Sequence, residues 1–323
     1  MPQHPSTPRG FALLALALLA GGCGGGADRP AADSAAAVAD TAGPAGPTAK
    51  PVATVDSLDG PEAARWDAEL KLWFISNVNG GPSGKDNNGY ISRLTSTGAM
   101  DSLKFVAGGR DKVTLNAPKG MVIVGDTLWV ADIDVVRGFD RKSGASVATI
   151  RVPGARFLND IAVGPDGIYV TDSGILIGAD GQMTHPGPDA VYKIAGRTVT
   201  TAITFDGKPA PNGITWDSAG RRFVIVPFAD NAISAWTPGD SIPQKIAEGP
   251  GMQDGVEEFG GGRFLVTAWG DSSLSVLSEG KLTKLVGDLP GGADLGYDPA
   301  SGRVAVPQLT ENKVQIFEVS PGR

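Results

Sequence analysis

The sequence has only one cysteine, Cys23, and only two histidines, His4 and His185. One cysteine excludes an intramolecular disulfide and any metal or haem site built on cysteine side chains. A Ser-His-Asp triad would have to use His185, because His4 lies in a predicted export signal, and the motif G-x-S-x-G does not occur. The chemistry of this chain therefore has to come from other side chains.

Long apolar runs and helical periodicity are also scarce. The longest apolar run covers residues 11–20, which is too short to span a bilayer, and no later segment is longer. No window of 11–18 residues has the spacing of an amphipathic helix, whereas the 46 glycines fall in short turns between strand-like segments. The net charge of −7 argues against a nucleic-acid partner.

The N-terminus is typical of an exported lipoprotein. Arg9 precedes the apolar run, and Ala20, Gly21 and Gly22 lead directly to Cys23. This pattern predicts a signal peptide over residues 1–22 and a lipid on Cys23 that holds the protein at the bacterial cell envelope, with no other membrane contact; simple secretion is the alternative. Residues 23–50 are mostly Gly, Ala, Pro and Asp, which predicts a flexible linker, and the folded domain is expected over residues 51–323.

One sequence pattern occurs six times in this domain. Each copy has a polar or small pair, a short apolar strand, a Gly/Asp turn and a stronger β-branched or aromatic strand, as in "LNDIAVGPDGIYVTDS" and "PNGITWDSAGRRFVIVPF". The equivalent positions 62, 119, 159, 212, 254 and 293 are 39 to 57 residues apart. This period predicts an all-β, six-bladed β-propeller with four-stranded antiparallel blades. A β-sandwich, the competing fold, would not explain the repeated phase.

Three segments fall outside the repeat. "PVATVDSL", before the first copy, is predicted to complete the last blade and close the ring. "NVNGGPSGKDNNG" and "GILIGADGQMTHPGPDA" are insertions in the first and third blades, and the first is expected to form a mobile loop over one face. His185 lies in the second insertion and is expected to be a loop residue.

The first positions of the repeats carry polar side chains. In a propeller the innermost strand of each blade lines the central channel, and its first residues lie at the channel mouth. These positions are Glu62, Lys119, Asn159, Asn212, Asp254 and Ala293. Two carboxylates and two amide carbonyls around one point would suit Ca²⁺, Mg²⁺ or Mn²⁺, and Zn²⁺ less well. Asn and Asp also cap turns, which is the structural alternative, and Asp160 and Asp294 at the following position fit that role better.

These residues resemble a known family. Glu, Asn, Asn and Asp at the inner-strand starts of four blades are similar to the metal-binding set of the senescence-marker-protein/gluconolactonase/luciferin-regenerating-enzyme family. "GPEAARWDAELKLWFISN", "PNGITWD" and "QDGVEEFGGGRFLVTAW" look like that family's first, fourth and fifth blades, and "RFLND" resembles its Arg-Phe-Asn-Asp run with Leu158 added. The resemblance covers nearly the whole propeller.

The resemblance implies a role for each matching residue. Glu62, Asn159, Asn212 and Asp254 would bind a divalent metal, Ca²⁺ first and Mg²⁺, Mn²⁺ or Zn²⁺ as alternatives. Asp254 would also be the base that activates water against a lactone or ester carbonyl polarised by the metal. Arg156 and Asp160 would contact a small-molecule substrate. Propeller lactonases that depend on a histidine dyad are excluded by the histidine count.

Lys119 departs from the family pattern. It could pair with Glu62 or Asp254 and replace the metal, or it could bind a substrate carboxylate or carbonyl. The sequence therefore predicts a monomeric, envelope-tethered, metal-dependent hydrolase. The alternatives are a non-catalytic propeller that binds a ligand or protein partner, and a lyase or isomerase acting at the same ring.

Trp269, near a strand end, either lines the site or packs in the core.

Overall fold

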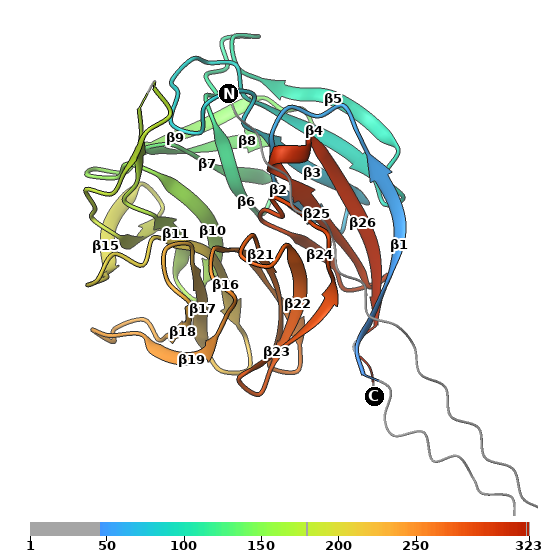
Figure 1. Cartoon of the computed structure of the whole chain (residues 1–323). Coiled ribbons are helices and arrows are strands. Elements are labelled where there is room, and N and C mark those ends of the chain that lie inside the picture. Colours follow the sequence, from blue (N-terminus) through green and yellow to red (C-terminus); the bar gives the residue numbers. More distant parts are fainter. Residues whose placement is uncertain (1–45, 179, 321, 323) are drawn as a thin grey trace, which may run out of the picture. The chain divides into compact units, whose positions relative to one another are not determined.

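Six four-stranded antiparallel sheets surround a central axis (Figure 1). The structure, a computed structural model, describes residues 46–178, 180–320 and 322. Neighbouring strands of each sheet follow one another along the chain, except where a two-stranded hairpin interrupts the third sheet and where the N-terminal strand closes the last one. The predicted fold class, an all-β six-bladed propeller with four-stranded antiparallel blades, is confirmed.

The blades are numbered from the N-terminus, and their strands run from the axis outward. Blade one holds β2 (Pro61–Asp67), β3 (Leu72–Asn77), β4 (Tyr90–Thr95) and β5 (Met100–Ala107). Blade two holds β6 (Pro118–Val124), β7 (Thr127–Asp132), β8 (Val135–Asp140) and β9 (Ser146–Arg151). Blade three holds β10 (Leu158–Gly164), β11 (Gly167–Asp172), β14 (Ala190–Ala195) and β15 (Thr198–Thr204).

The remaining three blades repeat this arrangement. Blade four holds β16 (Pro211–Asp217), β17 (Arg222–Pro227), β18 (Ala232–Trp236) and β19 (Gln244–Glu248). Blade five holds β20 (Gln253–Gly260), β21 (Arg263–Ala268), β22 (Ser273–Ser278) and β23 (Lys281–Val286). Blade six holds β24 (Gly296–Asp298), β25 (Arg303–Gln308), β26 (Lys313–Ser320) and β1 (Thr48–Val55), and the 3₁₀ helix η1 (Leu309–Glu311) joins β25 to β26.

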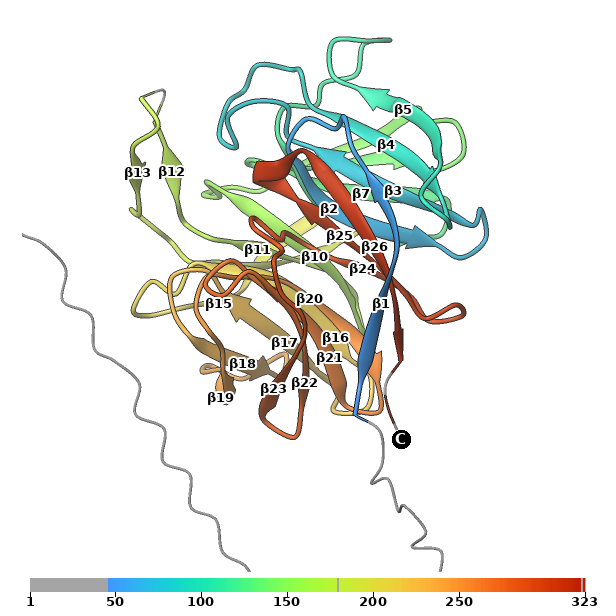
Figure 2. The same ribbon diagram turned by 45° about the vertical axis from the view of Figure 1, so that its right-hand side comes forward.

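The strand before the first repeat closes the ring, as the sequence predicted. β1 pairs antiparallel with β26 from Thr48 opposite Ser320 to Val55 opposite Val314. The last blade is thus built from both ends of the domain, and its outer edge is occupied by β1 (Figures 1 and 2). The strand begins at Thr48, three residues before the expected start of the domain at residue 51.

Each boundary between neighbouring blades has its own hydrophobic core. Between blades six and one, Trp73 is fully buried, packs against Trp66 at a ring-centroid distance of 4.7 Å and belongs to one cluster with Ala305 and Ile316. Five similar clusters occupy the other boundaries. Because apolar burial is satisfied between the blades, polar side chains can line the axis without disrupting a core.

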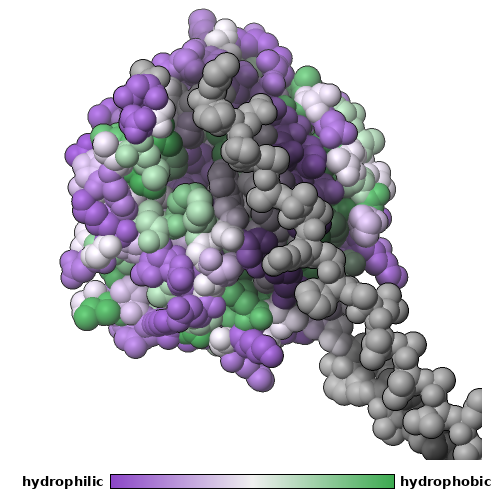
Figure 3. Space-filling model, viewed as in Figure 1, coloured by the Kyte–Doolittle hydropathy of each residue, from purple (hydrophilic) through white to green (hydrophobic). Residues whose placement is uncertain are grey.

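One insertion forms an extra hairpin. β12 (Leu176–Ile177) and β13 (Met183–Thr184) pair antiparallel and project from the body of the propeller (Figure 2). Figure 3 shows hydrophilic and hydrophobic residues interspersed over the face seen in the view of Figure 1. The predicted signal peptide, Cys23 and most of the predicted linker lie outside the described residues. In the described part of the chain, no helix is long and apolar enough to cross a membrane.

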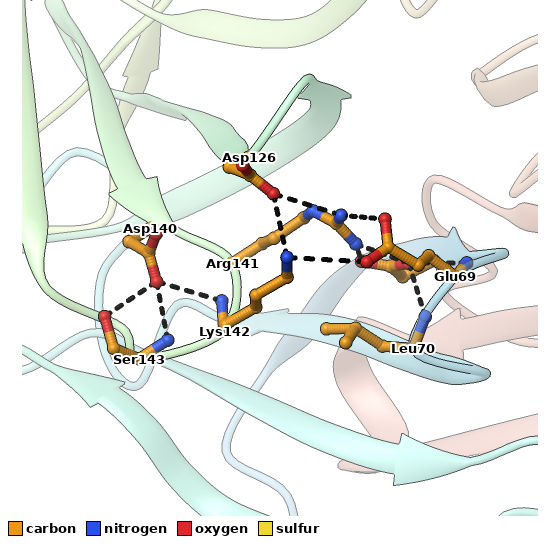
Figure 4. Close-up of polar contacts among 8 residues, drawn as sticks. Glu69, Leu70, Asp126, Asp140, Arg141, Lys142 and Ser143 are labelled. Carbon is orange, nitrogen blue, oxygen red and sulfur yellow. Dashed lines mark hydrogen bonds and ion pairs between the residues drawn. The ribbon is translucent and has the colours of Figure 1, made fainter.

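A buried arginine joins the turns of blades one and two (Figure 4). Arg141 Nη1 donates to Asp67 Oδ2 at 2.8 Å and to Oδ1 at 3.0 Å, while Nη2 bonds Glu69 and lies 3.2 Å from Asp126 Oδ1. The side chains of Arg141 and Asp67 are 5% and 2% exposed, whereas Lys142, which lies 3.2 Å from Asp126, is 51% exposed. The strength of this junction therefore lies in the Arg141–Asp67 pair.

We expect Arg141→Met to lower the free energy of unfolding by about 3–5 kcal/mol, because it leaves Asp67 buried without its partner. Lys142→Met, the exposed neighbour, should change that energy by less than about 1 kcal/mol. Urea unfolding followed by tryptophan fluorescence measures both. Equal effects of the two substitutions would contradict the assignment of this junction to Arg141.

Candidate functional site

The inner strands are irregular at their first residues. In five blades the register between the inner and second strands shifts within the first four residues. These shifts fall at Pro61/Ala63, Pro118/Met121, Leu158/Ile161, Pro211/Ile214 and Gln253/Val256. Such bulges release residues from the hydrogen-bond ladder and redirect their side chains. The released residues include all five polar side chains predicted at the channel mouth.

Hydroxyl side chains of the second strands hold these bulges against the next blade. Thr171 Oγ1 accepts from Asp160 N at 3.0 Å and donates to Asn212 O at 2.6 Å. Thr267 Oγ1 accepts from Gly255 N and donates to Ala293 O, both at 2.8 Å. Gly255 has to be a glycine because a Cβ there would lie 2.7 Å from the next blade. The first positions of neighbouring blades are therefore fixed relative to one another.

The five polar first-position residues line one cavity of about 230 Å³. They are 1% to 6% exposed, and we call them the polar ring: Glu62, Lys119, Asn159, Asn212 and Asp254. The structure thus brings together all four predicted metal ligands and Lys119. Within the described residues no three His, Cys, Asp or Glu side chains are grouped to hold a metal; the predicted ligand set contains only two such residues.

A second set of residues forms the wall of the cavity. Each follows directly after the second strand of its blade, and we call this set the collar: Val78, Ser173, Phe228, Trp269 and Leu309. Each collar N–H donates to the carbonyl of the residue two before its blade's first position, at 2.9 or 3.0 Å. Four of the five side chains are apolar. The cavity therefore has a polar ring and a mainly apolar wall on one backbone framework.

Three oxygen atoms of the polar ring have no protein partner. Glu62 Oε2, Asn212 Oδ1 and Asp254 Oδ1 are buried and accept no hydrogen bond within the described part of the chain. Each unpaired buried acceptor costs about 1–3 kcal/mol, so three at one cavity indicate a partner from outside the chain. Carboxylate and amide oxygens are the ligands of hard cations. The residues therefore fit a divalent metal.

Both carboxyl groups of the polar ring have a raised pKa. Burial raises the pKa of Glu62 well above its usual range, and the charge of Asp254 raises it further. Burial also raises the pKa of Asp254 to about 8, with a further contribution from Asp160. A cation between the carboxyl groups would act in the opposite direction and favour the ionised form of both.

Asn159 is oriented by the collar. Its Nδ2 donates to Ser173 Oγ at 3.2 Å, and that hydroxyl donates to Pro211 O of the next blade at 2.8 Å. With the amide nitrogen engaged, the amide oxygen is the group available to a ligand. Ser173 therefore positions Asn159 for the role that the sequence predicted.

Lys119 makes no ion pair with Glu62 or Asp254. Its Nζ donates to Pro82 O at 3.0 Å and to Ala117 O at 3.2 Å, and it lies 4.3 Å from the ring centroid of Phe157. Burial lowers the pKa of Lys119, and Glu62 is the charge that most opposes this effect. The ammonium group is held by carbonyls and an aromatic face, which does not support the expectation that it pairs with the carboxylates in place of a metal.

Arg156 and Asp160 do not line the cavity. Arg156 is exposed, and its Nε donates to Gly187 O at 2.5 Å in the loop before β14. Asp160 is buried; its two oxygens accept from Ile161 N at 2.7 Å and from Ile214 N of the next blade at 2.8 Å. Both side chains are engaged by the fold, and their contact with a substrate stays a prediction.

The repeats of the sequence identify the polar ring but not most of the cavity wall. Trp269, for which two environments were open, lines the cavity and packs edge-on against Phe228 at 5.6 Å. Phe157, Ile177 and Met183 also line it. The collar residues could be found in the sequence because they hold the same position in each repeat. Apolar residues at that position, however, cannot be told apart from core residues.

No protein-family model and no curated protein matches the sequence. Solved structures do match. A gluconolactonase from Xanthomonas campestris shares 16% identity with a TM-score of 0.61, covering 82% of this chain and 88% of that one. A luciferin-regenerating enzyme shares 13% identity with a TM-score of 0.61, covering 85% and 95%.

A third match comes from a different enzyme class. A catalytically inactive histidine-to-alanine variant of virginiamycin B lyase from Staphylococcus aureus, with quinupristin, shares 13% identity with a TM-score of 0.53, covering 84% of this chain and 99% of that one. At these identities the likeness shows the fold alone. The resemblance predicted from the sequence is therefore confirmed as a shared propeller fold with the gluconolactonase and luciferin-regenerating enzyme.

Proposed function

We propose that this chain hydrolyses a lactone or related ester with the help of a divalent cation held by Glu62, Asn159, Asn212 and Asp254. The observation that carries the proposal is the meeting of these four oxygen-bearing side chains, from four different blades, at one cavity with three oxygens unpaired. Ca²⁺ is the first candidate because all the donors are hard oxygens, and water and substrate would complete its coordination.

Each residue of the ring has a chemical task in this proposal. The bound cation would polarise the carbonyl of the substrate. Asp254 would accept a proton from the attacking water and return it to the alkoxide that leaves when the ester C–O bond breaks. Lys119 has used two of its three N–H donors on backbone carbonyls, and the third can bind the carbonyl oxygen as negative charge develops. The apolar collar limits the access of bulk water.

A histidine-dependent lyase is less well supported. The inactive virginiamycin B lyase variant has one histidine replaced by alanine. In this chain, His185 lies outside the cavity and its Nε2 is 2.7 Å from Asp189 Oδ1. Among the described residues no other histidine is available. The ring of oxygens favours metal-assisted hydrolysis.

We also propose that the protein is a monomer exported to the cell envelope and anchored only through a lipid on Cys23. A closed propeller leaves only short outer edges on its blades and needs no partner chain to complete a sheet. Mass spectrometry of the mature N-terminus tests this anchor. We expect residues 1–22 to be absent and Cys23 to carry a lipid. A mature protein that retains those residues would contradict it.

Calcium titration calorimetry on the purified chain tests the ligand set. Asp254→Asn removes a charged oxygen ligand, so we expect the dissociation constant for Ca²⁺ to rise at least about tenfold. Asp294→Asn is the matched control, because Asp294 is also buried but lies one position past the ring and does not line the cavity. An equal loss of affinity in both variants would count against the assignment.

Hydrolysis tests the catalytic role of Asp254. At saturating Ca²⁺ we expect Asp254→Asn to lower kcat by about 10²–10⁴-fold on any lactone that the natural chain turns over, because the general base is lost. Proton release in a pH-stat measures the rate, and Asp294→Asn should retain kcat within about threefold. Turnover that survives Asp254→Asn would exclude this residue as the base.

A further inference from the structure

The cavity wall offers a substrate few hydrogen-bonding groups, one of which is the indole N–H of Trp269, buried without a partner among the described residues. Beyond the polar ring, its lining includes Phe157, Ile175, Ile177, Met183, Phe228 and Trp269. The one collar hydroxyl, on Ser173, is already bonded to Asn159 and to Pro211 O. A sugar-type lactone carries a hydroxyl on most of its carbons, and each hydroxyl buried without a partner costs binding affinity. This wall is therefore poorly matched to a polyhydroxylated ring.

The mouth of the cavity is apolar because of the two insertions. The hairpin of β12 and β13 contributes Ile177 and Met183, and the blade-one insertion contributes Val78 and Pro82. The two insertions meet where Ile177 N lies 3.4 Å from Ser83 Oγ. Met183 is 60% exposed although it borders the cavity, so it presents apolar surface that an entering ligand would cover.

We infer that the substrate is a small apolar lactone or ester, with alkyl or aryl substituents on the carbon skeleton, and not a sugar lactone. The polar ring engages the carbonyl, while the collar and the hairpin cover the hydrocarbon part. At about 230 Å³ the cavity lies below the ~300–1,000 Å³ typical of sites for drug-sized ligands, which favours a small molecule. The inference rests on the proposed function, because it names the substrate class of that reaction.

Adjacent residues of β12 provide a matched pair of variants. Ile177 lines the cavity, whereas Leu176 is 38% exposed and does not. The same substitution at both positions therefore separates loss of the apolar wall from disturbance of the hairpin. We expect Ile177→Asn to weaken the binding of an apolar ligand by about tenfold and Leu176→Asn to leave it within about twofold.

Calorimetry with lactams measures this binding without turnover. The probes are 5-alkyl-2-pyrrolidinones with side chains of one to four carbons and, as the polar counterpart, the lactam of gluconic acid. With the full chain and Ca²⁺ we expect affinity to rise by about fourfold per added methylene, until the cavity is full. The gluconic lactam should bind more weakly than the butyl compound.

Three results would overturn the inference. The first is tighter binding of the gluconic lactam than of the butyl compound. The second is an alkyl series whose affinity does not depend on chain length. The third is an equal loss of affinity in Ile177→Asn and Leu176→Asn, in variants whose thermal unfolding matches that of the natural chain. These results are separable from a failure of the proposed function. A normal chain-length series without hydrolysis of any matching lactone would refute the hydrolase and leave the apolar ligand class supported.

Discussion

The bulge at the start of each inner strand is the constraint on which the site depends. A regular ladder would leave the first residues of β2, β6, β10, β16 and β20 committed to pairing with the second strands. The register shifts release them, and the hydroxyls of Thr171 and Thr267 then hold the released backbone against the next blade. Because the apolar burial of the domain lies between the blades, the axis can hold polar side chains that a conventional core would exclude.

Two layers with different chemistry result from this framework. The polar ring concentrates two carboxyl groups, two amides and one ammonium at 1% to 6% exposure, which is costly unless an external partner compensates it. The collar surrounds that ring with aromatic and aliphatic side chains, which lowers the local dielectric constant and strengthens every charge interaction inside. A cation at the ring and a hydrocarbon group at the collar are the two partners that this combination suits.

The sequence was informative where polarity contradicted the expected burial. Asn159 at the start of an apolar strand became meaningful because four of its five sister repeats have a polar residue at the same position. The closing strand β1 followed from the same count of repeats. Phe228 and Trp269 gave no such contrast, since an apolar residue after a strand is equally typical of core. The direction of Lys119 and Arg156 was inaccessible as well, because Pro82 O and Gly187 O, which accept their hydrogen bonds, belong to loops that no repeat predicts.

We propose that four blades together build one divalent-cation site. Its most direct test is elemental analysis by mass spectrometry of the full chain, purified without chelator and dialysed against buffer containing Ca²⁺, Mg²⁺, Mn²⁺ and Zn²⁺ at equal concentration. We expect about one tightly held divalent ion per chain, with Ca²⁺ preferred, and its loss when Glu62→Gln and Asp254→Asn are combined. A folded natural chain that retains no divalent ion would contradict it.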